Sequence, residues 1–202
     1  MGEWNYDRIM EFSKYASAVL IGCGIGMSDS TKKLVKRLIS DISCPIILDA
    51  DGINCISDSI DIIKQNRSGI ILTPHPAEMG RLCSRDTADI LSDRIGAARD
   101  LAEKFNAVVV LKGAGTVIAG SKKTFINTTG NPGMAKGGSG DVLSGIIASL
   151  AAQGIDLFES AAAGAYIHGR AGDIAAEKLT MQYMTATDII KNLPDVFKEI
   201  TE

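Results

Sequence analysis

The segment richest in chemistry is a glycine-rich run that ends in a carboxylate, Gly137-Gly-Ser-Gly-Asp141, directly before an apolar helical stretch. Glycine lets the backbone approach a ligand closely, and the dipole of the following helix favours an anion. The segment therefore predicts a site for a phosphoryl group. A carboxylate repels phosphate, so Asp141 fits there as a base that takes the proton of a hydroxyl attacking phosphorus. The alternative is that Asp141 only occupies the first turn of a helix, where acidic residues are favoured.

Other candidate ligand groups follow predicted strands, in the segments 22–26, 49–52, 73–76 and 112–116. His75 stands between two prolines that stiffen the backbone, which suits a hydrogen-bonding role, although a lone histidine is often structural. The run Gly22-Cys-Gly-Ile-Gly26 lacks the third glycine of the dinucleotide fingerprint, so it is either a ligand contact or a tight turn. Asp49 and Asp51 are open to a metal or substrate role, or to an ordinary turn.

Several further residues have alternative interpretations. Lys112-Gly-Ala-Gly-Thr116 either contacts a nucleotide through its backbone and Thr116 or is only a turn. Glu78 is a candidate helix-capping acid, and His168 lies in an alanine-rich helical stretch, where we interpret it as a packing or interface residue. The four cysteines form no C-x-x-C pair and the chain has only 2 histidines, which argues against a zinc site.

Composition excludes several classes of protein. The 202 residues include 21 basic and 24 acidic side chains, for a net charge of −3, and so lack the basic footprint that nucleic acid or an anionic membrane requires. The longest uncharged stretch, residues 142–155, is too short to span a bilayer, and the first residues carry no apolar signal-peptide core. We expect a cytoplasmic protein with no nucleic-acid or membrane partner.

Hydrophobic patterning predicts the elements that position these groups. Apolar runs predict strands at 18–21, 45–49, 69–72 and 107–111, with helices at 29–40 and 88–105, a hairpin from 116–119 to 124–127, and helix from Ser139 almost to the end, interrupted near Gly154 and Pro194. Fully apolar strands that alternate with helices indicate one α/β domain over 1–202, with a mostly parallel sheet covered on both faces. Ligands of such sheets bind at the carboxyl ends of the strands.

Four longer segments together resemble one family: LDADGIN, LTPHPAEMGRL, VVLKGAGTVIA and NPGMAKGGSGDVLSGIIASLAAQG. From about Ala18 to Ala176 the chain resembles the ADP- or ATP-dependent NAD(P)H-hydrate dehydratases of the ribokinase-like superfamily. The resemblance implies a three-layer α/β sandwich and a lyase that repairs damaged nicotinamide cofactors. In that reaction the S form of NADHX or NADPHX is dehydrated while ADP, or ATP in some members, is converted to AMP.

The resemblance also implies roles for individual residues and partners. The nucleotide would be held by Lys112, Gly113, Ala114, Gly115, Thr116 and Gly140. Asp141 would bind the hydrate and act as the base toward its hydroxyl, and His75 and Gly24 or Gly26 would also contact the hydrate. The anion pocket would be shaped by Asn131, Gly133, Gly138 and Ser139. We expect Mg²⁺ held mainly by phosphates, with no dedicated protein ligands, and a homo-oligomer.

Three departures from the family pattern leave alternatives open. Cys23 stands where the family usually has proline, and Ser139 where it usually has threonine. The chain is also expected to lack the glycine-rich strand–loop–helix region with which the family domain begins. One alternative is therefore a catalytically weak nucleotide-binding paralogue. Another is a small-molecule kinase of the same superfamily, which shares the start of the Asp141 helix but does not predict the 73–76 and 112–116 segments.

Overall fold

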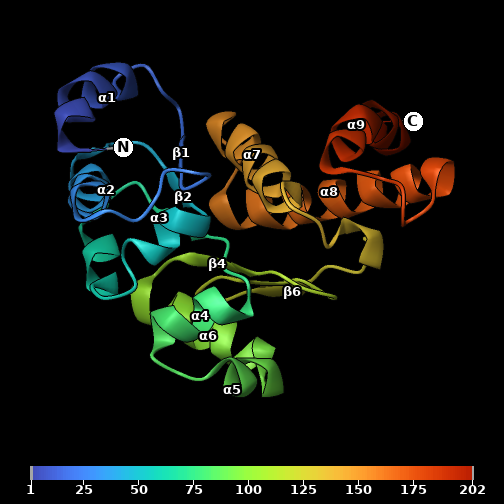
Figure 1. The fold of residues 1–202 in the computed structure, drawn as a ribbon, viewed down its shortest axis with the longest axis horizontal. Helices are drawn as coiled ribbons and strands as arrows, with labels where there is room; N and C mark the ends of the chain where they lie inside the picture. The colour runs from blue at the N-terminus through green and yellow to red at the C-terminus, as the bar shows by residue number, and fades with distance from the viewer. Residues whose placement is uncertain (1, 202) are drawn as a thin grey trace.

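Six strands form one sheet, in the order β1-β2-β3-β4-β5-β6, in the computed structural model, which describes residues 2–201 (Figure 1). Strands β1 to β4 are parallel, and β5 and β6 are antiparallel to their neighbours. The predicted, mostly parallel sheet is thereby confirmed. The strands are β1 (Val19–Ile21), β2 (Ile46–Leu48), β3 (Ile70–Leu72), β4 (Val108–Leu111), β5 (Val117–Ala119) and β6 (Thr124–Ile126).

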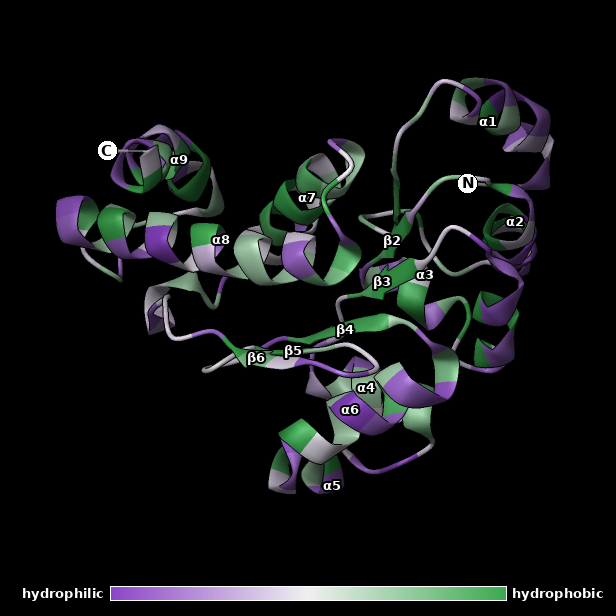
Figure 2. Ribbon diagram, turned by 180° about the vertical axis from the view of Figure 1, so that it is seen from behind, coloured by the Kyte–Doolittle hydropathy of each residue, from purple (hydrophilic) through white to green (hydrophobic). Residues whose placement is uncertain are grey.

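The sheet separates two hydrophobic cores because successive side chains of a strand point to opposite faces. In β2, Ile46 and Leu48 belong to one core and Ile47 to the other, and β3 repeats the pattern. Figure 2 shows the hydrophobic central strands in green, with hydrophilic residues in purple on the surrounding helices. Burial on both faces explains why these strands are apolar throughout instead of alternating with polar residues.

Helices cover both faces of the sheet. One face is covered by α2 (Asp29–Asp41), α3 (Ala50–Asn54), α4 (Pro76–Cys83), α5 (Thr87–Ser92) and α6 (Arg94–Phe105). The other face is covered by α7 (Ser139–Ala152) and α8 (Leu157–Leu179), with α9 (Ala186–Thr201) packed on α8. At the N-terminal side, α1 (Tyr6–Ser13) lies against α2. Helices therefore lie on both sides of the sheet, as predicted.

Two details of the helices differ from the sequence prediction. The single helix predicted at 88–105 is two helices, because the chain breaks at Asp93, whose carboxylate accepts the N–H of Gly96 and caps α6. Pro194 lies inside α9 and does not interrupt it, since the buried face of α9, including Ile189 and Val196, holds the helix against α8. The break comes earlier, after Thr180, which adopts a left-handed φ of 73°.

No helix within residues 2–201 has the length and apolarity needed to cross a membrane.

Candidate active site at the carboxyl ends of the strands

Asp49 is the centre of a group of charged side chains that follow β2, β3 and β4. Only 1% of Asp49 is exposed, and its Oδ1 accepts hydrogen bonds from Thr73 Oγ1 at 2.7 Å and Lys112 Nζ at 2.8 Å. Lys112 Nζ also lies 3.8 Å from Glu78 Oε2. A buried carboxylate is tolerated only with such compensation. We call Asp49, Thr73, His75, Glu78 and Lys112 the charged cluster.

His75 caps the start of α4. Its Nδ1 accepts the N–H groups of Ala77 at 3.2 Å and Glu78 at 3.3 Å, and the Glu78 carboxylate accepts the N–H of His75 in return. Because Nδ1 is an acceptor, the proton is on Nε2, which lies 3.2 Å from Glu78 Oε1. Burial is the largest cause that lowers the pKa of His75, so the ring is neutral at pH 7. Glu78 is the capping acid that the sequence indicated.

Asp141 lies in the first turn of α7, exposed and directed toward the charged cluster. Ligand atoms of Cys23, Asp49 and Asp141 all lie within 4.8 Å of one another. Burial raises the pKa of the Cys23 thiol, which is neutral at pH 7 and a poor ligand for a hard cation. The donors that fit Mg²⁺ here are the two carboxylates, so its other ligands would come from phosphate and water.

The loop from Gly22 to Gly26 lies directly over Asp49. A Cβ on Gly22, whose φ is +149°, would come within 1.7 Å of the Asp49 carbonyl oxygen, so only glycine permits this approach. Gly26 donates its N–H to Asp51 Oδ2 at 2.9 Å, which makes Asp51 a support for the loop. Gly24 and Gly26 have left-handed φ values of 68° and 76°.

A cavity of about 740 Å³ lies beside the charged cluster, bounded by the loop after β4, the segment 126–135, the start of α7 and one face of α8. All six residues with expected nucleotide roles line it: Lys112, Gly113, Ala114, Gly115, Thr116 and Gly140. Asn131 and Ser139 line it as well. Gly133 instead backs onto the Met181 backbone and Gly138 onto Ala186. The groups expected to meet the hydrate do not line this cavity. Asp141 lies beside Asp49, His75 beside Glu78, and Gly26 is bonded to Asp51.

Two residues that the sequence analysis missed hold the walls of this cavity. Arg94 of α6 donates from Nη1 to the Ala114 carbonyl at 2.5 Å and from Nη2 to the Leu111 carbonyl at 3.1 Å, which fixes the loop after β4. Asp173 of α8 accepts the N–H of Gly130 at 2.9 Å and the side-chain amide of Asn131 at 3.0 Å. Neither residue belongs to a motif, so no sequence signal pointed to them.

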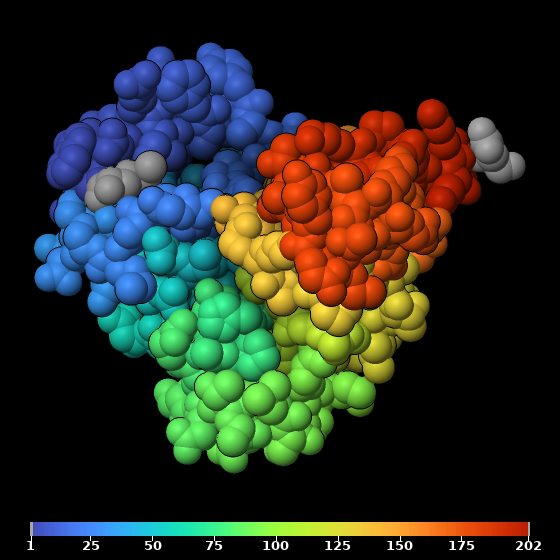
Figure 3. Space-filling view, turned by 45° about the vertical axis from the view of Figure 1, so that its right-hand side comes forward, coloured from blue at the N-terminus to red at the C-terminus, as the bar shows by residue number. Residues whose placement is uncertain are grey.

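His168 also lies in the cavity lining, where the sequence analysis expected a packing or interface residue. Figure 3 shows the orange helix α8 lying against the yellow part of the chain that forms the opposite wall. His168 is buried, as a packing residue would be, and it is also one of the residues that line the cavity.

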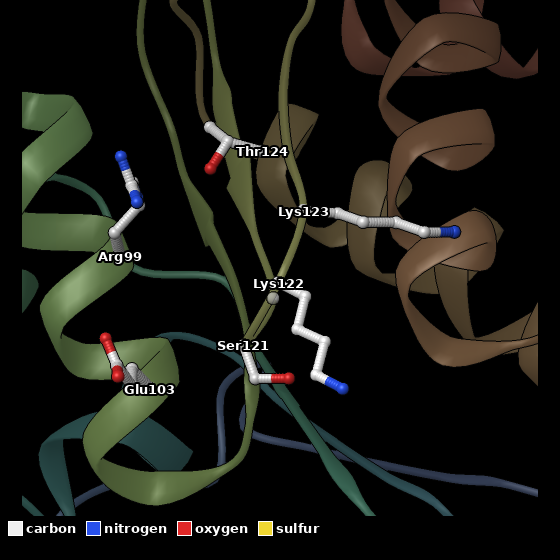
Figure 4. Close-up of a pocket in the computed structure, with 7 residues that line it drawn as sticks. Arg99, Glu103, Ser121, Lys122, Lys123 and Thr124 are labelled. Carbon is white, nitrogen blue, oxygen red and sulfur yellow. The ribbon is translucent and has the colours of Figure 1, made fainter.

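A second, smaller cavity lies at the opposite end of the β5–β6 hairpin (Figure 4). Its volume is about 270 Å³, and Arg99 and Glu103 of α6 face the turn residues 120–124 across it. Lys123 points away from it and bonds Glu159 at 2.8 Å. Because the residues around it include none with an expected chemical role, we assign it no function.

Comparison with known proteins gives consistent results. The family described as NAD(P)H-hydrate dehydratase matches residues 2–195. The chain is 40% identical over 199 residues to the bifunctional NAD(P)H-hydrate repair enzyme Nnr of Thermofilum pendens, covering 98% of this chain and 38% of that protein. It is 40% identical over 165 residues to the ADP-dependent (S)-NAD(P)H-hydrate dehydratase of Neisseria meningitidis, covering 80% of this chain and 56% of that one.

A solved structure agrees with the fold. The ADP/ATP-dependent NAD(P)H-hydrate dehydratase of Bacillus subtilis, co-crystallised with ATP and Mg²⁺ and soaked with CoA, superposes with a TM-score of 0.81 at 28% identity. The superposition covers 94% of this chain and 71% of that one. The chain thus spans well under two thirds of the length of the bifunctional relative, and most of the length of the Bacillus subtilis enzyme of known structure.

Proposed function

The chain belongs to the NAD(P)H-hydrate dehydratase family, and from this premise we propose that it dehydrates the hydrated nicotinamide cofactor NADHX or NADPHX while converting ADP or ATP. The observation that carries the proposal is the placement of Asp141 at the start of α7. There it faces Asp49, and it directly follows Gly140, which lines the cavity of about 740 Å³. A hydroxyl-bearing substrate and a nucleotide can therefore meet at this carboxylate.

The cavity supports binding of the nucleotide. The loop 112–116 forms one wall, and the N-terminus of α7, where helix dipole and free N–H groups favour phosphate, forms another. A Cβ on Gly140 would lie 3.6 Å from Lys112 Nζ, so the lysine ammonium adjoins the start of the helix. Lys112 thus supplies positive charge at the boundary between the cavity and the charged cluster.

Asp141 would begin the reaction by accepting the proton of the hydrate's hydroxyl. The hydroxyl oxygen then attacks the terminal phosphorus of ADP, and AMP leaves with the electron pair of the broken P–O bond. Phosphate next departs with the electron pair of the ring C–O bond while the adjacent carbon loses a proton, which restores the ring double bond. In sum, ADP and the hydrate yield AMP, phosphate and the reduced cofactor.

His75 and the charged cluster would orient the hydrate. The His75 ring is half exposed and neutral, and its Nδ1 is fully occupied by the cap of α4, so the ring is held in one orientation. Asp49 and Asp141 would hold Mg²⁺ together with the phosphates, and the bound ion would neutralise charge on the transferring phosphoryl group.

Assembly as a homo-oligomer is also proposed. Trp4, Phe12 and Tyr15 are 80%, 64% and 88% exposed and offer apolar surface for it. Light scattering on the purified protein tests the oligomer: a mass of 21.3 kDa would contradict it.

Recovery of NADH from NADHX, followed by absorbance with ADP or ATP and Mg²⁺, tests the proposed function. Recovery that requires the nucleotide supports the dehydratase. ADP binding without recovery would contradict it and favour the nucleotide-binding paralogue, and a stable phosphorylated product would favour the kinase.

A further inference from the structure

Lys136 directly precedes the glycine-rich turn, residues 137–140, that leads into α7. Its Nζ donates hydrogen bonds to the backbone carbonyls of Met181 at 3.1 Å, Gln182 at 3.0 Å and Met184. Three acceptors match the three N–H donors of an ammonium group, and hydrogen bonds from a charged donor are about twice as strong as neutral ones. The side chain of Lys136 therefore ties the glycine-rich turn to the loop between α8 and α9.

The loop between α8 and α9, residues 180–185, is itself held in place. Met184 donates its N–H to the Thr180 carbonyl at 3.2 Å, and only 1% of Met184 is exposed. Thr185 donates its N–H at 3.0 Å and its hydroxyl at 2.7 Å to Asp188 Oδ2, which joins the loop to the first turn of α9. A loop that is fixed by a buried side chain and by the following helix is a firm support for Lys136.

The glycine-rich turn also touches this support directly. A Cβ on Gly138, whose φ is +87°, would lie 3.3 Å from the Cβ of Ala186 at the start of α9. The Lys136 carbonyl accepts the N–H of Ser139, the first residue of α7, at 3.3 Å. Lys136 is thus bound at both ends: its side chain to the loop after α8, and its carbonyl to the start of α7.

Lys136 does not itself line the large cavity, whereas Ser139 and Gly140 do. Three of the four residues of the glycine-rich turn are glycines, which lose the most conformational freedom on folding. The preference of a helix N-terminus for an anion falls off within its first turn, so the N–H groups there must be held close to the phosphates. A turn of this composition needs an anchor outside itself, and Lys136 supplies one.

We propose that Lys136 is a positioning residue that holds the glycine-rich turn where its N–H groups meet the phosphates of the nucleotide. The inference rests on the proposed function and adds to it a residue that acts without touching the nucleotide. Because the turn faces the phosphates and the loop 112–116 forms another wall of the cavity, Lys136 should affect binding of the phosphates and not of the nucleoside.

Lys136→Met tests this role, because it keeps a side chain of similar length and removes the ammonium. The Kd for ADP, measured by calorimetry, should rise about tenfold as the turn loses its anchor. Adenosine carries no phosphate, and its Kd, measured by displacement of ADP, should change by less than about twofold. A general loosening of the cavity would instead weaken both ligands equally.

Lys178→Met is the matched control, since Lys178 also joins α8 to α9 but makes no contact with the glycine-rich turn. Its Nζ donates to Asn192 Oδ1 at 2.7 Å and to Asp195 Oδ2 at 2.6 Å. This variant should lower the thermal midpoint and leave the Kd for ADP within about twofold of the unsubstituted chain. It thereby separates loss of stability from loss of positioning.

The inference is overturned if Lys136→Met binds ADP with unchanged Kd, if ADP and adenosine weaken equally, or if Lys178→Met raises the Kd for ADP as much as Lys136→Met. Absence of ADP binding by the unsubstituted chain would overturn both proposals. ADP binding that depends on Lys136 in a chain that recovers no NADH would overturn the dehydratase alone.

Discussion

The charged cluster and the large cavity adjoin each other at one edge of the sheet. They differ in whether their buried polar side chains have hydrogen-bond partners. In the charged cluster, Asp49 is satisfied by Thr73 and Lys112, and His75 by the backbone of α4. In the cavity, two buried polar atoms have no partner within the described residues. A region satisfied by its own side chains is pre-organised, whereas the wall of the cavity keeps buried polar atoms unpaired.

Asp141 belongs fully to neither region. It adjoins Asp49 and Cys23, but it is exposed and sits on the same helix start that lines the cavity. The difference between the regions suggests a division of labour: the cavity binds the nucleotide, the charged cluster holds its own geometry, and Asp141 acts between them. Each prediction below challenges this division.

Asp141→Asn is expected to have the largest effect, and this effect is on the rate of NADH recovery. Loss of the base should lower the rate of NADH recovery by about 10²–10⁴-fold, while the Kd for ADP measured without Mg²⁺ stays within about twofold, because Asp141 would meet the nucleotide only through the ion. Steady-state kinetics and calorimetry on the same preparation check both values. Equal loss of rate and affinity would show that Asp141 serves binding, against the division proposed here.

Asp49→Ala should destabilise the fold because it leaves Lys112 without its close partner. Removal of one member of a buried ion pair costs about 3–5 kcal/mol of the free energy of unfolding, measured by urea denaturation. The matched control is Asp58→Ala, which removes a pair of similar length, Lys36 Nζ to Asp58 Oδ1 at 2.9 Å, on the surface. That change should cost less than about 1 kcal/mol. Equal losses would mean that the charged cluster is not pre-organised.

Acid should destabilise the protein through His168. Its pKa falls from 6.5 to about 4 on folding, so the unfolded chain binds the proton more tightly. The contribution of this shift to the free energy of unfolding is complete above about pH 6.5. It is lost as the pH falls toward 4, so that the free energy of unfolding decreases by about 3 kcal/mol in total. Denaturation between pH 4 and 7 should show a shallower slope for His168→Gln. Identical slopes would place the native imidazole in solvent.

Arg94→Ala is expected to have the smallest effect, and this effect is on the Kd for ADP. Without its guanidinium the carbonyls of Leu111 and Ala114 are no longer fixed, and the Kd for ADP should rise about tenfold, with turnover at saturating ADP little changed. Arg99→Ala is the control, because Arg99 lies on the same helix but faces the small cavity of Figure 4. A similar change in Kd for both variants would contradict a specific role for Arg94.

The sequence predicted the sheet well because the strands are buried on both faces. Runs such as Val108–Leu111 then carry an unbroken apolar signal. The break at Asp93 was missed because apolar spacing continues through it from α5 to α6. The predicted interruption near Pro194 was wrong because the packing of α9 on α8 outweighs the local tendency of proline to break a helix.

The site was predictable only where backbone chemistry marks it. The glycines near Asp141 and the prolines around His75 are local signals, so the sequence could nominate those residues. The role of Arg94 depends on contacts to residues 17 and 20 positions away. The position of His168 in the cavity lining depends on packing of α8 against the segment after β6. Such placements arise from the fold and leave no local pattern.

The most direct test of the account is the stoichiometry of the complete reaction. NADHX, ADP and Mg²⁺ are incubated with the protein, and NADH, AMP and phosphate are quantified in the same samples over time. The account predicts one AMP and one phosphate for each NADH recovered, and formation of all three slowed by about 10²–10⁴-fold with Asp141→Asn. AMP formed without NADH, or NADH recovered without AMP, would contradict the proposal that the two regions act on one shared reaction.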